Sequence, residues 1–285
     1  MKSNKTKKTN EIFEKLVNGV EKVINNGEYE KFLKFCKHFH KYSFNNIVLI
    51  FSQREDATMV AGFKTWQKMN RKLKKGAKGI QIMFPMKRTY TKKIDGQSSL
   101  LDDDNEKDTK TIEYFIYRPT YVFDVSDTVG EPLPMESKNI DSDSMIDFFN
   151  FLKEYSPYHV EEDELYGGCN GYWNSNSKKI VLKKWLSVDD KTSVLLHELT
   201  HAFYDDFNYK EDRDLSETFV ESVAYIVADY FGLDTSSCSF NYITGWADGD
   251  ITKIIELGDK IQKSANDFIK KLEDEYNNKN IRICV

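Results

Sequence analysis

The sequence predicts an α+β protein, with a small α+β domain followed by a mainly helical domain that contains a small β-sheet. Amphipathic runs with apolar residues at helical spacing lie in both halves of the chain. Aromatic and β-branched runs between residues 80 and 125 are typical of strands. The segment EPLPMESKNIDSD has two prolines and no hydrophobic period, as expected of a linker. We therefore expect domains over residues 1–130 and 143–285, joined by a linker over residues 131–142.

The first half begins with helices. From Glu11 to Ile24 the apolar residues recur at helical spacing, and the sequence NNG ends the run. The stretches EYEKFLKFCKHFHKYS and NNIVLIFSQ predict two more helices, and FKTWQKMNRKL predicts a short basic helix closed by KKGAKG. The stretches IQIMFPM, TIEYFIYR and TYVFDV predict strands, with Pro119 between the last two and a charged loop over residues 92–110.

The second half is predicted to be mostly helical. A helix around SMIDFFNFLKEY is followed by GYWNSNSKKIVLKKW, in which NSNS reads as a turn and IVL as a strand. Three further helices are predicted over DDKTSVLLHELTHAFYDDF, LSETFVESVAYIVADYFG and ITKIIELGDKIQKSANDFIKKLEDEY.

The composition is that of a folded, soluble protein. Of the 285 residues, 40% are hydrophobic and 31% are charged, and no apolar run has the length of a membrane span or of a signal peptide. We expect the protein to stay in the cytoplasm. Its four cysteines are scattered without a Cys-x-x-Cys pair, which argues against both a disulfide framework and a cysteine zinc site.

Positive charge is concentrated in the first half of the chain. Residues 1–130 hold 25 Lys and Arg against 16 Asp and Glu, whereas residues 131–285 hold 16 against 30. Residues 61–93 contain eleven basic residues and no acidic one, interleaved with the aromatic residues Phe63, Trp66, Phe84 and Tyr90. Cations that follow a phosphate backbone, alternating with rings on which bases stack, are typical of single-stranded nucleic acid binding. The predicted nucleic-acid-binding residues are Lys64, Trp66, Lys68, Arg71, Lys72, Lys74, Lys75 and Lys78.

The stretch VLLHELTHAF predicts a metal site. His197 and His201 are four residues apart, so a helix places both imidazoles on one face, where they can bind one ion. Glu198 lies one step round the helix, where its carboxylate can reach a metal-activated water, as in the H-E-x-x-H signature. The alternative is two core histidines bonded to backbone carbonyls. That alternative must also explain a buried, unpaired glutamate between them, which is costly.

A catalytic zinc site needs a third protein ligand and an open position. No histidine follows His201, so we expect an acidic ligand from the next helix. Glu221, in its most apolar part, is the first choice. Glu217, one turn earlier, is the alternative ligand or orients a histidine from behind. With Zn²⁺ bound, Glu198 would take a proton from water and pass it to a leaving amine, so peptide hydrolysis is the expected reaction.

Several motifs, in order, resemble the ArdC-type antirestriction proteins carried on plasmids and conjugative elements. NNIVLIFSQREDATMVAGFKTWQKMNRKLKKGAKGIQIMFP and YVFDVSDT are similar to the N-terminal domain of that family. GYWNSNSKKIVL, LLHELTHAF, ESVAYIVADYFGLDT and YITGW are similar to its zincin-like metallopeptidase domain. The resemblance spans about residues 10–250. It implies a single-stranded DNA-binding domain fused to a zinc peptidase-like domain that protects incoming DNA from restriction. An acidic insertion at 95–108 and the C-terminal helix depart from the pattern.

Two other functions remain compatible with these residues. One is a protein that coats single-stranded DNA and keeps a non-catalytic zinc site. The other is a peptidase that cleaves a repressor, with the first domain binding protein rather than DNA. Salt separates them, because binding to phosphates weakens steeply as the salt concentration rises.

Overall fold

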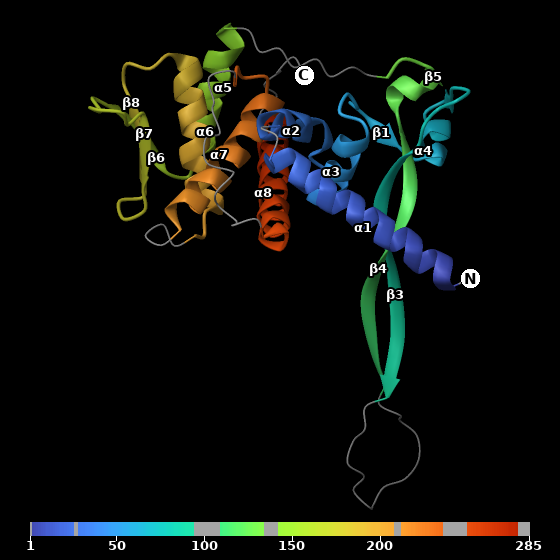
Figure 1. Cartoon of the computed structure of the whole chain (residues 1–285). Coiled ribbons are helices and arrows are strands. Elements are labelled where there is room, and N and C mark those ends of the chain that lie inside the picture. Colours follow the sequence, from blue (N-terminus) through green and yellow to red (C-terminus); the bar gives the residue numbers. More distant parts are fainter. Residues whose placement is uncertain are drawn as a thin grey trace, which may run out of the picture.

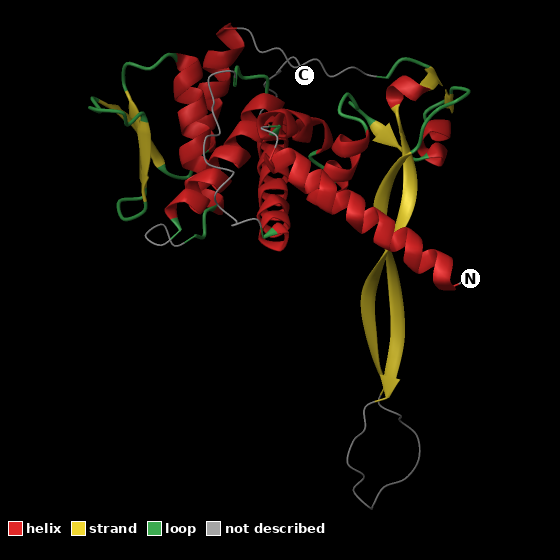
Figure 2. Ribbon diagram, viewed as in Figure 1, coloured by secondary structure: helices red, strands yellow, loops and turns green. Residues whose placement is uncertain are grey.

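The computed structural model describes residues 2–25, 28–93, 109–133, 142–207, 212–235 and 250–278. It confirms the α+β class: most helices form the middle of the molecule, and small, separate sheets lie at its two sides (Figures 1 and 2). Helices and strands of the first half lie on one side of helix α8 (Ile251–Asn278), and those of the second half lie on the other (Figure 1). A long two-stranded ribbon projects from the first half (Figure 1).

The first half begins with the three helices that the hydrophobic pattern predicts. They are α1 (Lys2–Asn25), α2 (Tyr29–Cys36, followed by a 3-10 turn over Lys37–Phe39) and α3 (Phe44–Gln53). The apolar face of each helix is buried, and α3 has the most complete burial because it carries five apolar residues in succession. Rings from α2 and α3 meet edge to face, as in the pair Phe32 and Phe51 at 5.5 Å between centroids.

The short basic helix is shorter than predicted. Helix α4 (Phe63–Lys68) stops before Asn70, which adopts a left-handed backbone with φ of 54°. The chain then forms strand β2 (Arg71–Leu73), which pairs antiparallel with β5 (Thr128–Gly130). Propensity favoured helix for this stretch, but the partner strand, distant in sequence, supplies the hydrogen bonds that make it β.

The ribbon consists of β3 (Ile80–Lys93) and β4 (Thr109–Asp124), with β1 (Val60–Ala61) on the outer edge of β4. The two predicted strands around Pro119 form one strand. Pro119 lies opposite Met83, whose backbone N–H and C=O bond the side chain of Asn46 on α3. This pair therefore exchanges no backbone hydrogen bonds across the ribbon, so the missing proline N–H leaves no gap in the ladder. The predicted loop begins and ends in strand, and its central residues 94–108 lie outside the described ones.

The second half contains the predicted helix α5 (Ser142–Tyr155) and a three-stranded sheet. Strands β6 (His159–Asp163), β7 (Gly171–Asn174) and β8 (Lys179–Lys183) take the order β6-β8-β7. β6 runs parallel to β8 and β7 runs antiparallel to it. The Tyr-Trp pair before the predicted turn is itself strand β7. Strand β6, with the sequence HVEED, is too acidic to be predicted from its hydrophobic pattern.

Helices α6 (Val188–Tyr204) and α7 (Arg213–Tyr230) follow as predicted and pack against each other. Ser187 caps α6, because its hydroxyl accepts the backbone N–H of Asp190 at 3.1 Å. The apolar side of α7 is buried along its length, which holds it rigidly between α6, α8 and α2.

Helix α8 and helix α2 connect the two halves. α8 packs against α5 and α7 on one side and against α1 and α3 on the other, and α2 packs against α7. Gly258 of α8 lies against the ring of Phe44, where a Cβ would come within 2.4 Å of ring carbons. The buried side chains of both halves form one continuous cluster. The domain limits remain a prediction, since residues 134–141 of the expected linker lie outside the described residues.

Within the described residues, no helix has the length and apolar character needed to cross a membrane. Cys36 is buried and Cys169 is exposed, and both are free thiols. Cys238 and Cys284 lie outside the described residues.

Candidate metal centre

The two histidines of the predicted signature lie on one face of α6. Their ring centroids are 4.9 Å apart. Glu217 approaches both rings from α7, with its Oε2 3.5 Å from His197 Nε2 and 3.8 Å from His201 Nε2. One ligand atom from each of these three residues lies within 4.8 Å of the other two. Two imidazole nitrogens and one carboxylate oxygen are the donor set of a catalytic zinc site, so these residues fit a divalent ion.

Asp205, one turn after His201, orients the second imidazole. Its Oδ2 lies 2.8 Å from His201 Nδ1 and accepts the Ser216 hydroxyl at 2.6 Å, and its Oδ1 accepts the backbone N–H of Phe207 at 3.1 Å. In the neutral imidazole that binds an ion, a hydrogen bond donated from Nδ1 leaves the lone pair on Nε2, the nitrogen that faces Glu217. The sequence prediction missed Asp205. Asp205 could have been found from its spacing, because an acidic residue four positions after His201 lies on the same face of the helix.

The same contacts control the charge of His201. Burial lowers the pKa of His201, but its hydrogen bonds with Asp205 and Glu217 and the nearby charge of Glu198 outweigh burial and raise the pKa to about 9. Burial raises the pKa of the Asp205 carboxyl, but the hydrogen bonds from His201 and Ser216 outweigh it, and that pKa lies below its usual range. Without a bound ion, these shifts favour an ion pair in which Asp205 is negatively charged and His201 is positively charged.

The distances favour Glu217 over Glu221 as the third ligand. Both carboxylates line the same cavity, because they are four residues apart on α7. Glu221, the first choice from the sequence, is not among the residues whose ligand atoms lie within 4.8 Å of one another, and it is exposed at the cavity wall. Its apolar sequence neighbours point to the opposite side of the helix, where Phe219, Val220 and Val223 are fully buried. Apolar neighbours in sequence therefore did not indicate a buried carboxylate.

Glu198 is the most enclosed carboxylate of the site. Glu198 is only 6% exposed, although it has an ionisable carboxyl group. Burial raises the pKa of the Glu198 carboxyl, against the opposing effects of His197, His201 and a backbone hydrogen bond from Trp173 on β7. A carboxyl group in this environment is suited to accept and release a proton.

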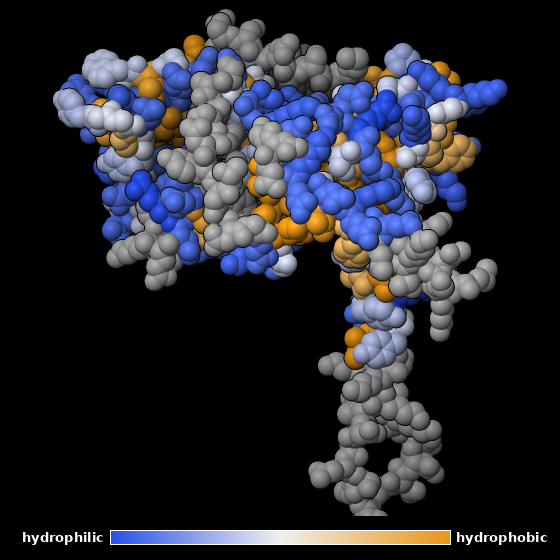
Figure 3. Space-filling view, viewed as in Figure 1, coloured by the Kyte–Doolittle hydropathy of each residue, from blue (hydrophilic) through white to orange (hydrophobic). Residues whose placement is uncertain are grey.

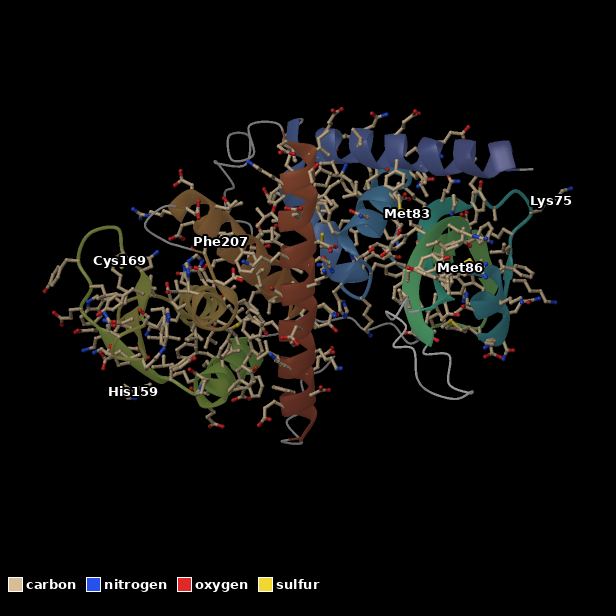
Figure 4. All side chains as sticks on the ribbon, turned by 90° about the horizontal axis from the view of Figure 1, so that it is seen from below. Lys75, Met83, Met86, His159, Cys169 and Phe207 are labelled. Atoms are coloured by element: carbon tan, nitrogen blue, oxygen red, sulfur yellow. The ribbon has the colours of Figure 1, made fainter. Side chains whose placement is uncertain are left out.

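A cavity of about 870 Å³ opens in front of these side chains. One wall is α6 and α7, and another is strand β7 with the Gly-rich loop before it. Gly171 lets β7 lie close to α6, because a Cβ there would come within 2.5 Å of Val194. Cys169, labelled in Figure 4, lies on that loop and lines the cavity, but it is outside the group of three ligands.

Tyr225 of α7 is held by packing and hydrogen bonds at the wall of the cavity. Tyr225 lines the cavity but is 3% exposed, and its hydroxyl contacts Glu30 at 3.4 Å and also bonds Thr235. Packing accounts for Tyr225, as its apolar neighbours on α7 suggest.

The predicted nucleic-acid-binding residues lie in the first half, around α4, β2 and the loop to β3. The six lysines are exposed, including Lys75 at the edge of the molecule in Figure 4. They are Lys64, Lys68, Lys72, Lys74, Lys75 and Lys78. Arg71 is half-buried, and its guanidinium holds β5 through Thr128 Oγ1 at 2.7 Å. Among the described residues none of these lysines forms an ion pair, and Lys74 donates a hydrogen bond to the carbonyl oxygen of Ser126 at 2.8 Å.

Trp66 needs correction as a member of that set. It is 0% exposed, and its Nε1 donates to the carbonyl oxygen of Phe123 at 2.9 Å. A ring with no accessible face cannot stack on a base, so Trp66 belongs to the core. Phe63, 49% exposed, is the ring that lies free beside the lysines.

Comparison with known proteins shows similarity in the N-terminal domain and in the fold. Residues 2–123 match the family model for the N-terminal domain of the anti-restriction factor ArdC. The uncharacterized Bacillus anthracis protein pXO2-81 is 24% identical over 301 residues, an alignment that covers 93% of this chain and 51% of that protein. The chain thus spans about half the length of this curated relative.

Two crystal structures of the antirestriction protein ArdC from plasmid R388 have a similar fold. The metal-free form matches with a TM-score of 0.53 and 15% identity, covering 83% of this chain and 86% of that one. The Mn(II)-bound form matches with a TM-score of 0.50 and 16% identity, covering 85% and 86%. The first part of this chain therefore matches the N-terminal domain of ArdC, and the fold of most of the chain is similar to that of ArdC.

Proposed function

We propose that this protein is a metal-dependent peptidase, with His197, His201 and Glu217 holding one divalent ion and Glu198 acting as the general base. The observation that carries the proposal is the convergence of three ligand atoms within 4.8 Å beside a buried glutamate at a large cavity. The donor set suits Zn²⁺, and the related ArdC structure with Mn(II) supports a divalent ion in general.

The bound ion would supply a Lewis acid that activates water and polarises a carbonyl group. Glu198 would take the proton from the attacking water at its carboxylate and deliver it to the leaving amine. Asp205 would hold His201 in the tautomer that presents Nε2 to the ion. Glu221, on the same wall of the cavity, adds negative charge near His197.

Strand β7 supports a peptide as the substrate. In the order β6-β8-β7 it pairs with β8 alone, so its other edge is unpaired within the sheet. The backbone hydrogen bond from Trp173 to Glu198 indicates that this edge faces the general base. An extended peptide can add to such an edge through backbone hydrogen bonds, which would bring one of its carbonyl groups to the site.

The test is cleavage of an unstructured peptide library by the full chain loaded with Zn²⁺ or Mn²⁺. We expect Glu198→Gln to keep the metal and lose about 100-fold or more in rate, the usual contribution of a general base. Glu256→Gln, a matched change at an exposed position of α8, should leave the rate unchanged. A metal-loaded wild type that cleaves nothing would refute the proposal, as would full activity in Glu198→Gln.

We propose further that the first half binds single-stranded DNA and that the protein acts in antirestriction. The six exposed lysines, the exposed ring of Phe63 and the ArdC N-terminal match support this. Reversing the charge at Lys72, Lys74 and Lys75 should abolish binding to an oligonucleotide and weaken protection of incoming DNA. A binding constant that does not change with salt would instead favour a protein partner, such as a repressor.

The alternative of a DNA-coating protein with a non-catalytic metal site is favoured by the position of the lysines, which lie on elements that do not line the metal cavity. It predicts that Glu198→Gln protects DNA as well as the wild type does. Loss of protection in Glu198→Gln with unchanged DNA binding would exclude it.

A further inference from the structure

The outer part of the β3–β4 ribbon exposes many aromatic side chains. At its base Ile80, Ile82 and Val122 are buried against the body of the protein. Met83 of β3 is still buried, but the next residue, Phe84, is exposed. The exposed rings of the outer part are Phe84, Tyr90, Tyr114, Phe115 and Tyr117, between 44% and 59% exposed. Figure 3 shows hydrophobic and weakly polar side chains on the ribbon below the body.

The strand register divides these side chains between two faces. Residues directly opposite each other in an antiparallel pair lie on the same face. Phe84 is opposite Arg118, and Arg88 is opposite Tyr114. The guanidinium face, as we call it, consists of Phe84, Met86, Arg88, Tyr90, Ile112, Tyr114, Ile116 and Arg118. The reverse face consists of Pro85, Lys87, Thr89, Glu113, Phe115 and Tyr117.

The two faces differ in charge. On the reverse face Lys87 pairs with Glu113 at 2.8 Å, so its charges cancel. The guanidinium face has two arginines and no acid, and neither arginine forms an ion pair with any described residue. Two rings of the guanidinium face, Tyr90 and Tyr114, contact each other edge to face at 5.8 Å between centroids. They nevertheless remain 49% and 44% exposed.

We propose that the guanidinium face is a base-stacking surface for single-stranded DNA, an inference that rests on the proposed DNA binding of the first half. Rings and guanidinium planes alternate across the ribbon, which provides stacking and phosphate contacts together. Alternate residues on a strand are about 6.7 Å apart, comparable to the separation of successive nucleotides in an extended single strand. Phe84 and Tyr90, six residues apart, span about 20 Å, the length of several nucleotides.

An unpaired strand fits this face better than a duplex. Bases in a duplex stack on one another and offer only their edges in the grooves, where polar side chains read them. Exposed aromatic rings form no hydrogen bonds with those edges, but they can stack on the faces of unpaired bases. The exposed lysines of the proposed DNA-binding surface lie on α4, β2 and the loop that leads into β3, so the ribbon continues from that surface along the chain.

The test compares two double variants of the full chain in binding to a fluorescent oligothymidylate at fixed salt. The first is Tyr90→Ala with Tyr114→Ala on the guanidinium face. The second, Phe115→Ala with Tyr117→Ala, removes two more exposed rings from the reverse face and is the matched control. We expect about tenfold or more loss of affinity in the first and little change in the second.

A second measurement tests the arginines. Replacing Arg88 and Arg118 by glutamine should reduce the slope of log affinity against log salt by about 1.4, whereas the tyrosine variant should keep the wild-type slope. Circular dichroism and metal content of each variant establish that the fold and the distant metal centre are intact.

The outcomes separate the two proposals. A wild type that binds single-stranded DNA with both double variants unchanged would overturn the stacking surface and leave the proposed DNA binding in place. A loss of duplex affinity alone, or a change in oligomeric state with unchanged DNA affinity, would also overturn it. A wild type that does not bind single-stranded DNA would refute the proposed DNA binding first and the stacking surface with it.

Discussion

Replacing Asp205 by asparagine tests whether the metal centre depends on the orientation of His201. The side chain of asparagine has nearly the same shape, so the backbone N–H of Phe207 can still donate to its oxygen. The substitution removes the negative charge, and one carboxylate oxygen that accepts from both His201 and Ser216 is lost. His201 would then lose its fixed tautomer, because an amide NH₂ opposite Nδ1 cannot accept a hydrogen bond from Nδ1–H.

Two estimates of the effect agree. A hydrogen bond to a charged group contributes about 1.5–3 kcal/mol. Loss of a group that orients a metal ligand typically weakens metal affinity by about 10- to 100-fold, which corresponds to about 1.4–2.8 kcal/mol. Because Asp205 is only 9% exposed, solvent does little to reduce this effect. We therefore expect Asp205→Asn to weaken Zn²⁺ and Mn²⁺ binding by about one to two orders of magnitude.

The assay is a competition titration with a chromophoric chelator, in which both proteins are at the same pH and metal concentration. Asp206→Asn is the matched control, because this adjacent aspartate is 78% exposed and its partner is Lys260 rather than a histidine. Its metal affinity should equal that of the wild type. Equal affinities for Asp205→Asn and the wild type would show that Asp205 does not position His201.

Three further predictions concern the fold that carries the two surfaces. Trp66→Ala should lower the free energy of unfolding by about 3–5 kcal/mol in urea denaturation, because it empties a fully buried site; a change below 1 kcal/mol would contradict the assignment of Trp66 to the core. Asn46→Ala should cost about 1–3 kcal/mol by leaving the backbone groups of Met83 unpaired, and a neutral result would mean that water replaces the amide. Asp124 has a pKa below its usual range: burial raises it, but hydrogen bonds from Ser126, Thr58 and Met59 outweigh burial. Its stabilising effect is present above the unfolded pKa of about 3.9 and is lost as the pH falls through the lower folded value. The stability difference between wild type and Asp124→Asn should therefore narrow in acid, and a difference independent of pH would exclude this role.

Local patterns in the sequence were sufficient to predict most helices and the pair of histidines at the candidate metal centre. Periodic apolar residues predict α1, α3, α5, α6, α7 and α8 because a helix buries one face whatever its partner is. His197 and His201 were recognisable because a spacing of four residues brings two side chains together within a single helix. In each case the contacts that determine the structure lie within a few residues along the chain.

Contacts between distant segments were decisive elsewhere. β2 became a strand instead of the end of a helix because β5, more than fifty residues later, pairs with it. Trp66 looked like a ring for stacking, yet the carbonyl of Phe123 and the surrounding core enclose it. The sequence ranked Glu221 above Glu217 from its apolar neighbours, whereas the packing of α7 on α6 brings Glu217 closer to the histidines.

The sequence by itself determined the α+β class, the helices and the pair of histidines, because helical periodicity is a local property that one segment carries alone. Only the tertiary structure decided which carboxylates face the histidines, that Asp205 holds His201, and which aromatic rings remain open on the ribbon. These depend on how two separate elements pack, and a side chain's direction relative to another element is not encoded in the spacing of either one.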